Sequence, residues 1–211
     1  MDLSALPPEY TSAIALTCKN GFIRPDLSAS DFEAYKGLDE SIHINPMEIS
    51  DTEREGLKKL CEVCPQMDIS DNIGISYSTA EEYLHGEAWI DQLIQSLNPE
   101  WSNIEKVAFI DNAIGKQISY SPDFNTEVSD AGVARALWKI IDSGYGVCNG
   151  IAQVEQYILG RIGVETQRIS GKHHSFLKLI NMEFPTQDGG TVTGNTILDP
   201  TWKFSCTKIW W

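Results

Sequence analysis

Three residues of the chain have the chemistry of a cysteine nucleophile and its helpers. Cys148 lies in the run Gly144-Tyr-Gly-Val-Cys-Asn-Gly150, and His174 and Asp199 follow in two later stretches patterned as strands. A thiol, an imidazole and a carboxylate can act as nucleophile, base and the group that orients the base. Each residue alone has an ordinary structural use, since a lone cysteine is usually a small buried hydrophobe. The three together indicate an acyl-transfer enzyme.

The stretch after Cys148 has the spacing of a helix. Apolar residues recur there at intervals of three and four, and Gly160 and Gly163 can both end the helix. Cys148 is therefore expected at or just before a helix N-terminus. Free N–H groups and the helix dipole at such an end stabilise a thiolate, and the same N–H groups are available to a developing oxyanion.

The base could be either of two neighbouring histidines. His173 and His174 begin a stretch that predicts a mostly buried strand, and adjacent strand residues face opposite ways. Only one of them can point at Cys148, and the apolar pattern does not choose between them. Asp199 precedes Pro200, which favours an extended backbone and places the carboxylate at a strand end. A turn-forming Asp-Pro is the plain alternative.

About half the chain, from Glu105 to Trp202, resembles the transglutaminase-like superfamily, whose members share the papain-like fold. The family pattern runs in order through a Tyr-containing segment after a helix, a Gly-x-Cys-x-Gly helix start, a Gly-(Ile/Val) helix exit, a Gly-x-x-His motif and Leu-Asp-Pro-Thr. The matching stretches are Ile118-Ser-Tyr-Ser-Pro122, Gly146-Val-Cys-Asn-Gly150, Gly163-Val164, Gly171-Lys-His-His-Ser-Phe176 and Leu198 to Thr201. Phe176 stands where the family usually has Trp.

The resemblance assigns roles to these residues. It implies Cys148 as nucleophile, His174 rather than His173 as base, and Asp199 as the residue that orients the base. It also suggests that Tyr120 positions the oxyanion or the substrate, whereas a core aromatic with a satisfied hydroxyl is the alternative. The fold that it implies is α+β, with a nucleophile helix packed on an antiparallel sheet.

The expected reaction is hydrolysis of an amide through a thioester, with a protein or peptide as substrate. A protease is favoured, and a protein-glutamine deamidase or transglutaminase is the alternative. The chain lacks the calcium-loop pattern of animal-type transglutaminases and the Arg-Gly-Gly-x-Cys start of arylamine acyltransferases. A non-catalytic protein-binding module on the same fold is the second alternative, although such a module need not keep all three residues.

Composition limits the classes of partner and the cellular compartment that we expect for the protein. The 211 residues are 42% hydrophobic and carry a formal net charge of −14, so phosphate backbones and anionic membranes would be repelled. We therefore expect no nucleic-acid or membrane partner, and the oligomeric state stays open. The N-terminal residues lack the pattern of a signal peptide, which predicts a cytoplasmic protein or one exported without a cleaved signal. Five cysteines, an odd number, fit free thiols in a reducing compartment.

No metal or other cofactor is expected. Cys61 and Cys64 form a Cys-x-x-Cys, but a zinc site would need two further ligands and the sequence offers no second pair at a suitable spacing. Both cysteines fall on the apolar face of a predicted helix. They are therefore interpreted as core residues.

A helical N-terminal region, 1–98, is expected before a catalytic core, 99–211, with both forming one compact unit. The pattern predicts helices and then strands, and Ser50–Glu53, Ser78–Glu81 and Ser102–Glu105 match the capping box. Helices are expected at 10–19, 30–35, 52–64, 79–97, 131–141 and 148–160, and a further one starts at the Ser102–Glu105 box and carries Val107, Ile110 and Ile114. Strands are expected at 164–170, 173–182, 195–199 and 207–211, with a turn at 187–190.

Overall fold

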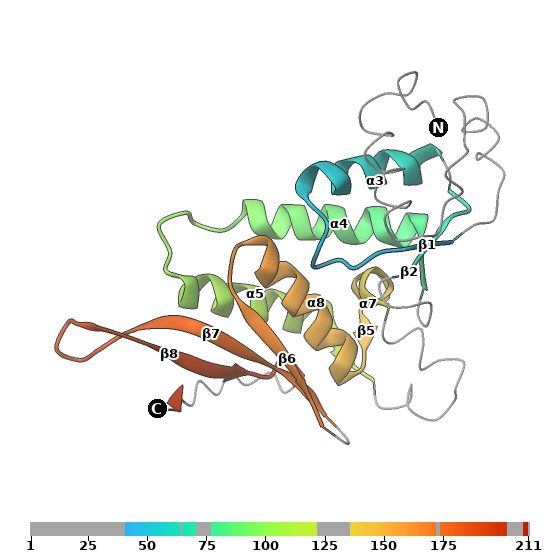
Figure 1. Cartoon of the computed structure of the whole chain (residues 1–211). Helices are drawn as coiled ribbons and strands as arrows, with labels where there is room; N and C mark the ends of the chain where they lie inside the picture. Colours follow the sequence, from blue (N-terminus) through green and yellow to red (C-terminus); the bar gives the residue numbers. More distant parts are fainter. Residues whose placement is uncertain are drawn as a thin grey trace. The chain divides into compact units, whose positions relative to one another are not determined.

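A computed structural model describes residues 41–63, 65–70, 77–121, 136–171, 174–201 and 209–210 (Figure 1). Helices and strands are mixed throughout, which confirms the α+β class. The chain divides into two compact units, Met1–Glu87 and Ala88–Trp211. The division falls inside a helix, before the boundary expected at 98–99. The predicted helices at 10–19 and 30–35 lie outside the described residues.

The first unit contains a small sheet that the sequence patterns did not predict. β1 (Ser41–His43) pairs in parallel with β2 (Asp68–Ser70), and β2 pairs antiparallel with β3 (Tyr77–Thr79). Each strand has only three residues, too few to show a reliable alternation of apolar and polar side chains. The N-terminal region is therefore not purely helical.

Helix α3 (Asp51–Val63) connects β1 to β2 and begins at the predicted capping box. The Ser50 N–H donates to Glu53 Oε2 at 2.8 Å, and the Glu53 N–H donates to Ser50 Oγ at 3.3 Å. Leu57 and Cys61 lie on the buried face, with Cys61 only 1% exposed, as expected for a core thiol. Cys64 lies outside the described residues.

Helix α4 (Ala80–Gln95) begins one residue later than the capping pattern suggested. The Thr79 N–H donates to Glu82 Oε2 at 2.8 Å and the Glu82 N–H donates to Thr79 Oγ1 at 3.2 Å, so the predicted Ser78–Glu81 box is wrong. The tertiary structure explains why the helix starts one residue later. Ser78 is the buried middle residue of β3 and pairs with Ile69 of β2, which leaves Thr79 to cap the helix.

In the second unit, the end of α4 is followed by helix α5 (Asn103–Gln117). Its Ser102–Glu105 capping box is confirmed, and the predicted apolar face, Val107, Ile110 and Ile114, is buried. A short strand, β4 (Ser119–Tyr120), follows directly. Helix α7 (Leu137–Ser143) occupies the described part of the helix predicted over 131–141.

Helix α8 (Cys148–Arg161) and a four-stranded sheet complete this unit. β6 (Thr166–Ser170), β7 (Ser175–Pro185), β8 (Thr191–Leu198) and β9 (Ile209–Trp210) are antiparallel neighbours in that order. Helix α8 packs on β6 and β7, and α5 packs on β7, so both helices cover the sheet (Figure 1). A helix followed by antiparallel strands was the expected arrangement.

The β7–β8 hairpin is longer than predicted. β8 begins at Thr191 rather than near 195, because its Thr- and Gly-rich start has no apolar alternation. The register shifts between Leu179 and Met182, where Asn181 adopts a positive φ of 54° and its N–H donates to Asn195 Oδ1 at 3.2 Å. Asn is among the few residues that tolerate this conformation, so the irregularity has a local cause.

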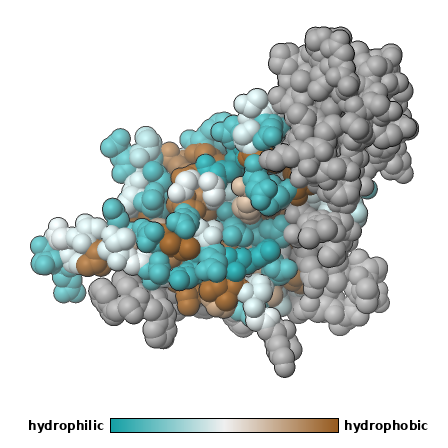
Figure 2. Space-filling model, in the orientation of Figure 1, coloured by the Kyte–Doolittle hydropathy of each residue, from teal (hydrophilic) through white to brown (hydrophobic). Residues whose placement is uncertain are grey.

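Within the described residues, no helix has the length and apolar content that a membrane crossing needs. Figure 2 shows a face on which hydrophilic residues predominate over the described elements, with hydrophobic residues gathered in separate small areas.

Candidate functional site

Cys148 is the first residue of α8, as the sequence predicted. Val147 precedes the helix in an extended conformation and supplies no side-chain hydrogen bond to it. The first N–H groups of α8 therefore receive no acceptor from an N-cap side chain, which leaves them suited to an oxyanion. The Cys148 side chain is half-buried and its thiol is free. The sulfur is thus placed at the N-terminus of a helix and is still accessible.

The approach to Cys148 is fixed by a backbone ladder between β4 and β5 (Tyr145–Gly146). Ser119 pairs with Tyr145 and Tyr120 with Gly146 in parallel register. A Cβ added to Gly146 would lie 3.0 Å from Ile140 Cγ2 and 3.1 Å from Ile151 Cγ1. Only glycine fits this close approach of the chain to α7 and α8, so Gly146 sets where the helix begins.

His174 and Asp199 meet at the start of β7 and the end of β8. His174 Nε2 lies 2.6 Å from Asp199 Oδ2, and the Thr201 N–H donates to Asp199 Oδ1 at 3.2 Å. Both carboxylate oxygens of Asp199 are thus engaged. The two side chains are 33% and 24% exposed, so solvent still reaches the pair. When the Nε2 proton is donated to Asp199, Nδ1 carries the lone pair that a base needs.

The order of elements puts this pair at the same end of the unit as Cys148. Residues 162–165 connect α8 to β6, which runs back along the helix, and Ser170 at the end of β6 pairs with Ser175 at the start of β7. The end of β6, the start of β7 and the beginning of α8 therefore lie together (Figure 1). Arg168 Nη1 donates to Gln153 Oε1 at 3.1 Å and ties β6 to α8.

A buried carboxyl group lies on the same helix as the thiol. Glu155 is 0% exposed, and neither of its carboxyl oxygens has a hydrogen-bond partner. Burial raises the pKa of Glu155 well above its ordinary value, and the carboxyl groups of Asp111 and Asp199 raise it further. The pKa of Asp111 on α5 is also raised, first by burial and then by Asp199. The carboxyl group of Asp199 thus raises the pKa of both Glu155 and Asp111.

Sequence reasoning missed Glu155 and Asp111. A usable signal was present, because Glu155 follows Cys148 by seven residues and interrupts a helix face that is otherwise apolar. A charged residue on such a face is either paired or shifted in its pKa. Asp111 offered a similar sign, since it lies four residues after Val107 and three before Ile114, both buried positions of α5.

Tyr120 is 42% exposed, so the alternative of a core aromatic is wrong. Its backbone pairs with Gly146, two residues ahead of Cys148, and Tyr145 beside it is 53% exposed. Two tyrosine rings on the surface next to the helix start can contact a substrate. His173 lies outside the described residues.

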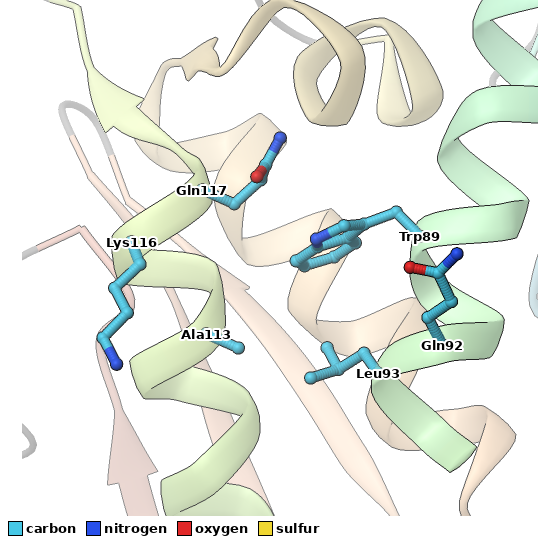
Figure 3. A pocket seen from close by; sticks show the side chains of 6 residues that line it. All are labelled: Trp89, Gln92, Leu93, Ala113, Lys116 and Gln117. Atoms are coloured by element: carbon cyan, nitrogen blue, oxygen red, sulfur yellow. The ribbon is translucent and has the colours of Figure 1, made fainter. Parts of the chain in front are cut away.

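The described residues contain no group of three or more His, Cys, Asp or Glu side chains placed to hold a metal ion. A hollow of about 330 Å³ lies between α4 and α5, and Cys148 is not part of its lining (Figure 3). Trp89 and Leu93 of α4 and Ala113 of α5 point toward one another there. The lining combines apolar, amide and lysine side chains: Trp89, Gln92, Leu93, Ala113, Lys116 and Gln117.

Comparison with known proteins adds no assignment. No protein-family model matches the chain, and no curated protein matches it in sequence. The functional reading therefore depends on the residues and their geometry.

Proposed function

We propose that the chain is a cysteine-dependent amide hydrolase with a papain-like core, acting through Cys148, His174 and Asp199. The single observation that carries the proposal is the 2.6 Å contact between His174 Nε2 and Asp199 Oδ2. The contact orients an imidazole at the end of the unit where Cys148 begins α8. A structural Asp-Pro turn alone would not require a histidine partner for the carboxylate.

The reaction has two halves. In the first, the proton of the Cys148 thiol passes to His174 Nδ1 while the sulfur attacks an amide carbonyl carbon. The carbonyl π electrons move to oxygen, and N–H groups at the start of α8 stabilise the oxyanion. The C–N bond then breaks, the amine leaves with the proton from His174, and a thioester remains on Cys148.

In the second half, His174 takes a proton from water, and the hydroxide formed attacks the thioester carbon. The C–S bond breaks, the carboxylic acid leaves, and Cys148 recovers its proton. Asp199 holds the imidazole in the tautomer that both halves need and stabilises the imidazolium that forms in each. Tyr120 is proposed to position the substrate, since its exposed ring lies beside the segment that leads into Cys148.

The substrate is proposed to be a protein or peptide, with cleavage of the main chain favoured over deamidation of glutamine. The net charge of −14 favours neutral or basic substrates over acidic ones. Both reactions use the same thioester, so the products distinguish them.

The test compares the native protein with Cys148→Ala in a cell lysate, with and without a tagged primary amine. Backbone cleavage creates new termini, deamidation converts Gln to Glu, and transamidation incorporates the tag with loss of ammonia. We expect new termini that require Cys148 and little tag incorporation, measured by mass spectrometry. Gln-to-Glu conversion would identify a deamidase, and heavy tag incorporation a transferase. If the same products form with Cys148→Ala, the proposed enzymatic function is refuted. Capture of a specific partner by Cys148→Ala would then favour a non-catalytic binding module.

A further inference from the structure

Glu155 is the buried titratable group that the proposed mechanism does not use. It follows Cys148 by seven residues, which is about two helical turns and the same face of α8. Its side chain is fully buried and both carboxyl oxygens lack a partner. An ionised carboxylate in this position would lose its hydration without gaining a hydrogen bond, at a cost of several kcal/mol or more. A neutral acid avoids most of that cost.

The neighbouring charges act in the same direction. Asp111 comes from α5 and Asp199 follows β8, and both raise the pKa of Glu155 beyond the effect of burial. We call Asp111, Glu155 and Asp199 the acid cluster. Like charges disfavour one another, so the carboxyl groups of Asp111 and Asp199 favour the neutral form of the buried Glu155.

Other charged groups on elements packed against α8 are not among the causes of the raised pKa of Glu155. Arg168 of β6 donates to Gln153 Oε1 at 3.1 Å. On β7, Leu177 and Leu179 are buried while Lys178 is half-exposed on the opposite face, and Glu183 is exposed. Helix α7 carries a half-exposed Lys139 and an exposed Asp142. The carboxyl groups that raise the pKa of Glu155 are thus those of Asp111 and Asp199.

We propose that Glu155 is a positioning residue that carries a proton at neutral pH, so that no second buried negative charge competes with Asp199 for His174. If Glu155 released that proton, its negative charge would compete with the charge of Asp199 and change the electrostatic environment of the imidazole. The catalytic meaning of this inference rests on the proposed function. The proton itself can be detected without a substrate.

Infrared spectroscopy tests for the proton directly. A protonated carboxylic acid in an apolar site has a carbonyl stretch separate from those of carboxylates and amides, and it shifts in heavy water. We expect native protein at neutral pH to show this band and Glu155→Gln to lose it. Glu165→Gln is the matched control, since Glu165 is exposed and should leave the band unchanged. A native protein without the band, or a band that survives in Glu155→Gln, would overturn the proposal.

The second readout is the pH titration of the His174 ring resonances by NMR, assigned by comparison with His174→Gln. Coupled groups titrate in more than one step, so the native ring should show a further inflection at the pH where Glu155 ionises, above the ordinary range of a carboxyl group. We expect Glu155→Gln to lose this inflection and Asp111→Asn to move it to lower pH. A merely structural Glu155 would give superimposable native and Glu155→Gln curves, which would contradict the proposal.

If Glu155→Gln does not fold, Asp111→Asn decides. An inflection that moves to lower pH supports the acid cluster, and an unmoved one refutes it. Neither readout requires turnover. A protein that shows the band and the inflection but no Cys148-dependent product would therefore refute the proposed function while the assignment of the proton stands.

Discussion

His174 Nε2 lies 2.6 Å from Asp199 Oδ2, although 25 residues separate the two along the chain. The contact brings together the start of β7 and the residue after β8, which are antiparallel neighbours with Leu177 paired to Leu198. The second oxygen of Asp199 accepts from the Thr201 N–H, so the carboxylate is held from both sides. The imidazole is consequently fixed by the sheet and by the turn that ends it.

Cys148 should be the fast-reacting thiol of the protein. It is half-buried at a helix start, whereas Cys61 is 1% exposed in the first unit. Limited alkylation with iodoacetamide at neutral pH, followed by peptide mass spectrometry, should find the earliest adduct on Cys148. Earlier labelling of Cys61 or Cys64 would contradict both the nucleophile and the interpretation of that pair as core residues.

Replacing His174 by Ala should remove the base and lower the Cys148-dependent rate by about 100-fold or more. The structure gives His174 a carboxylate partner at hydrogen-bond distance, which supports its choice over His173. The measurement is the rate of product formation together with the alkylation rate of Cys148. His173→Ala is the matched control and should keep most of both rates. Loss of activity in the control instead would mean that the base is the neighbouring residue.

Asp199→Ala should be less damaging than Cys148→Ala. An orienting group contributes less than the nucleophile in triads of this kind, by about one to two orders of magnitude in rate. Steady-state rates of the two variants, measured on the same substrate, provide the comparison. An equal loss of rate in both variants would mean that Asp199 takes a direct part in the chemistry or is needed for folding. A thermal melt of Asp199→Ala would distinguish these two explanations.

Gly146→Ala should destabilise the second unit by about 1–3 kcal/mol, the usual cost of overpacking. The new methyl group would meet Ile140 and Ile151 at 3.0–3.1 Å and push the start of α8 out of place. Gly115→Ala is a control in the interior of α5, where nothing lies within 4 Å of the added Cβ. It should instead stabilise the protein by about 0.5–1 kcal/mol. Chemical denaturation of both variants and Cys148 alkylation of Gly146→Ala provide the measurements.

Glu155→Gln should change how stability depends on pH. The pKa of Glu155 is raised in the folded state, so below its ordinary value of 4.5 the acid is neutral in both states. As the pH rises above that value, the unfolded chain loses the proton and the folded chain keeps it, which lowers the stability of the native protein. The variant lacks this titration. Between pH 4.5 and the raised pKa of the folded state, the free energy of unfolding of the variant should therefore increase relative to that of the native protein by about 1.4 kcal/mol per pH unit.

Urea unfolding of the native protein and Glu155→Gln at several pH values checks this difference. Glu165→Gln should follow the native curve, because Glu165 is exposed. A constant difference between native and Glu155→Gln across pH would show that Glu155 titrates alike in both states.

The sequence predicted best where local chemistry decides the structure. The Ser50–Glu53 and Ser102–Glu105 capping boxes form as expected, and α8 begins at Cys148. The start of α4 was misplaced because strand pairing buries Ser78, a long-range effect that no local pattern contains. Glu155 on an otherwise apolar helix face was a local signal, but its grouping with Asp111 and Asp199 could not be predicted, again because it depends on long-range packing. The three carboxyl groups of this acid cluster come from α5, α8 and the end of β8, and their mutual influence appears only once these elements pack.

Helix α8 has a consequence for motion. The thiol is at its first residue, and nearly every residue from Gly150 to Leu159 is buried. A helix enclosed in this way has few low-energy openings, so its amide protons should exchange with solvent only when the whole unit unfolds. If Cys148 is the nucleophile that we propose, it belongs to a part of the fold that should be among the slowest to exchange. Adjustment to different substrates would then be expected from the exposed residues Tyr120 and Tyr145 and not from movement of the thiol.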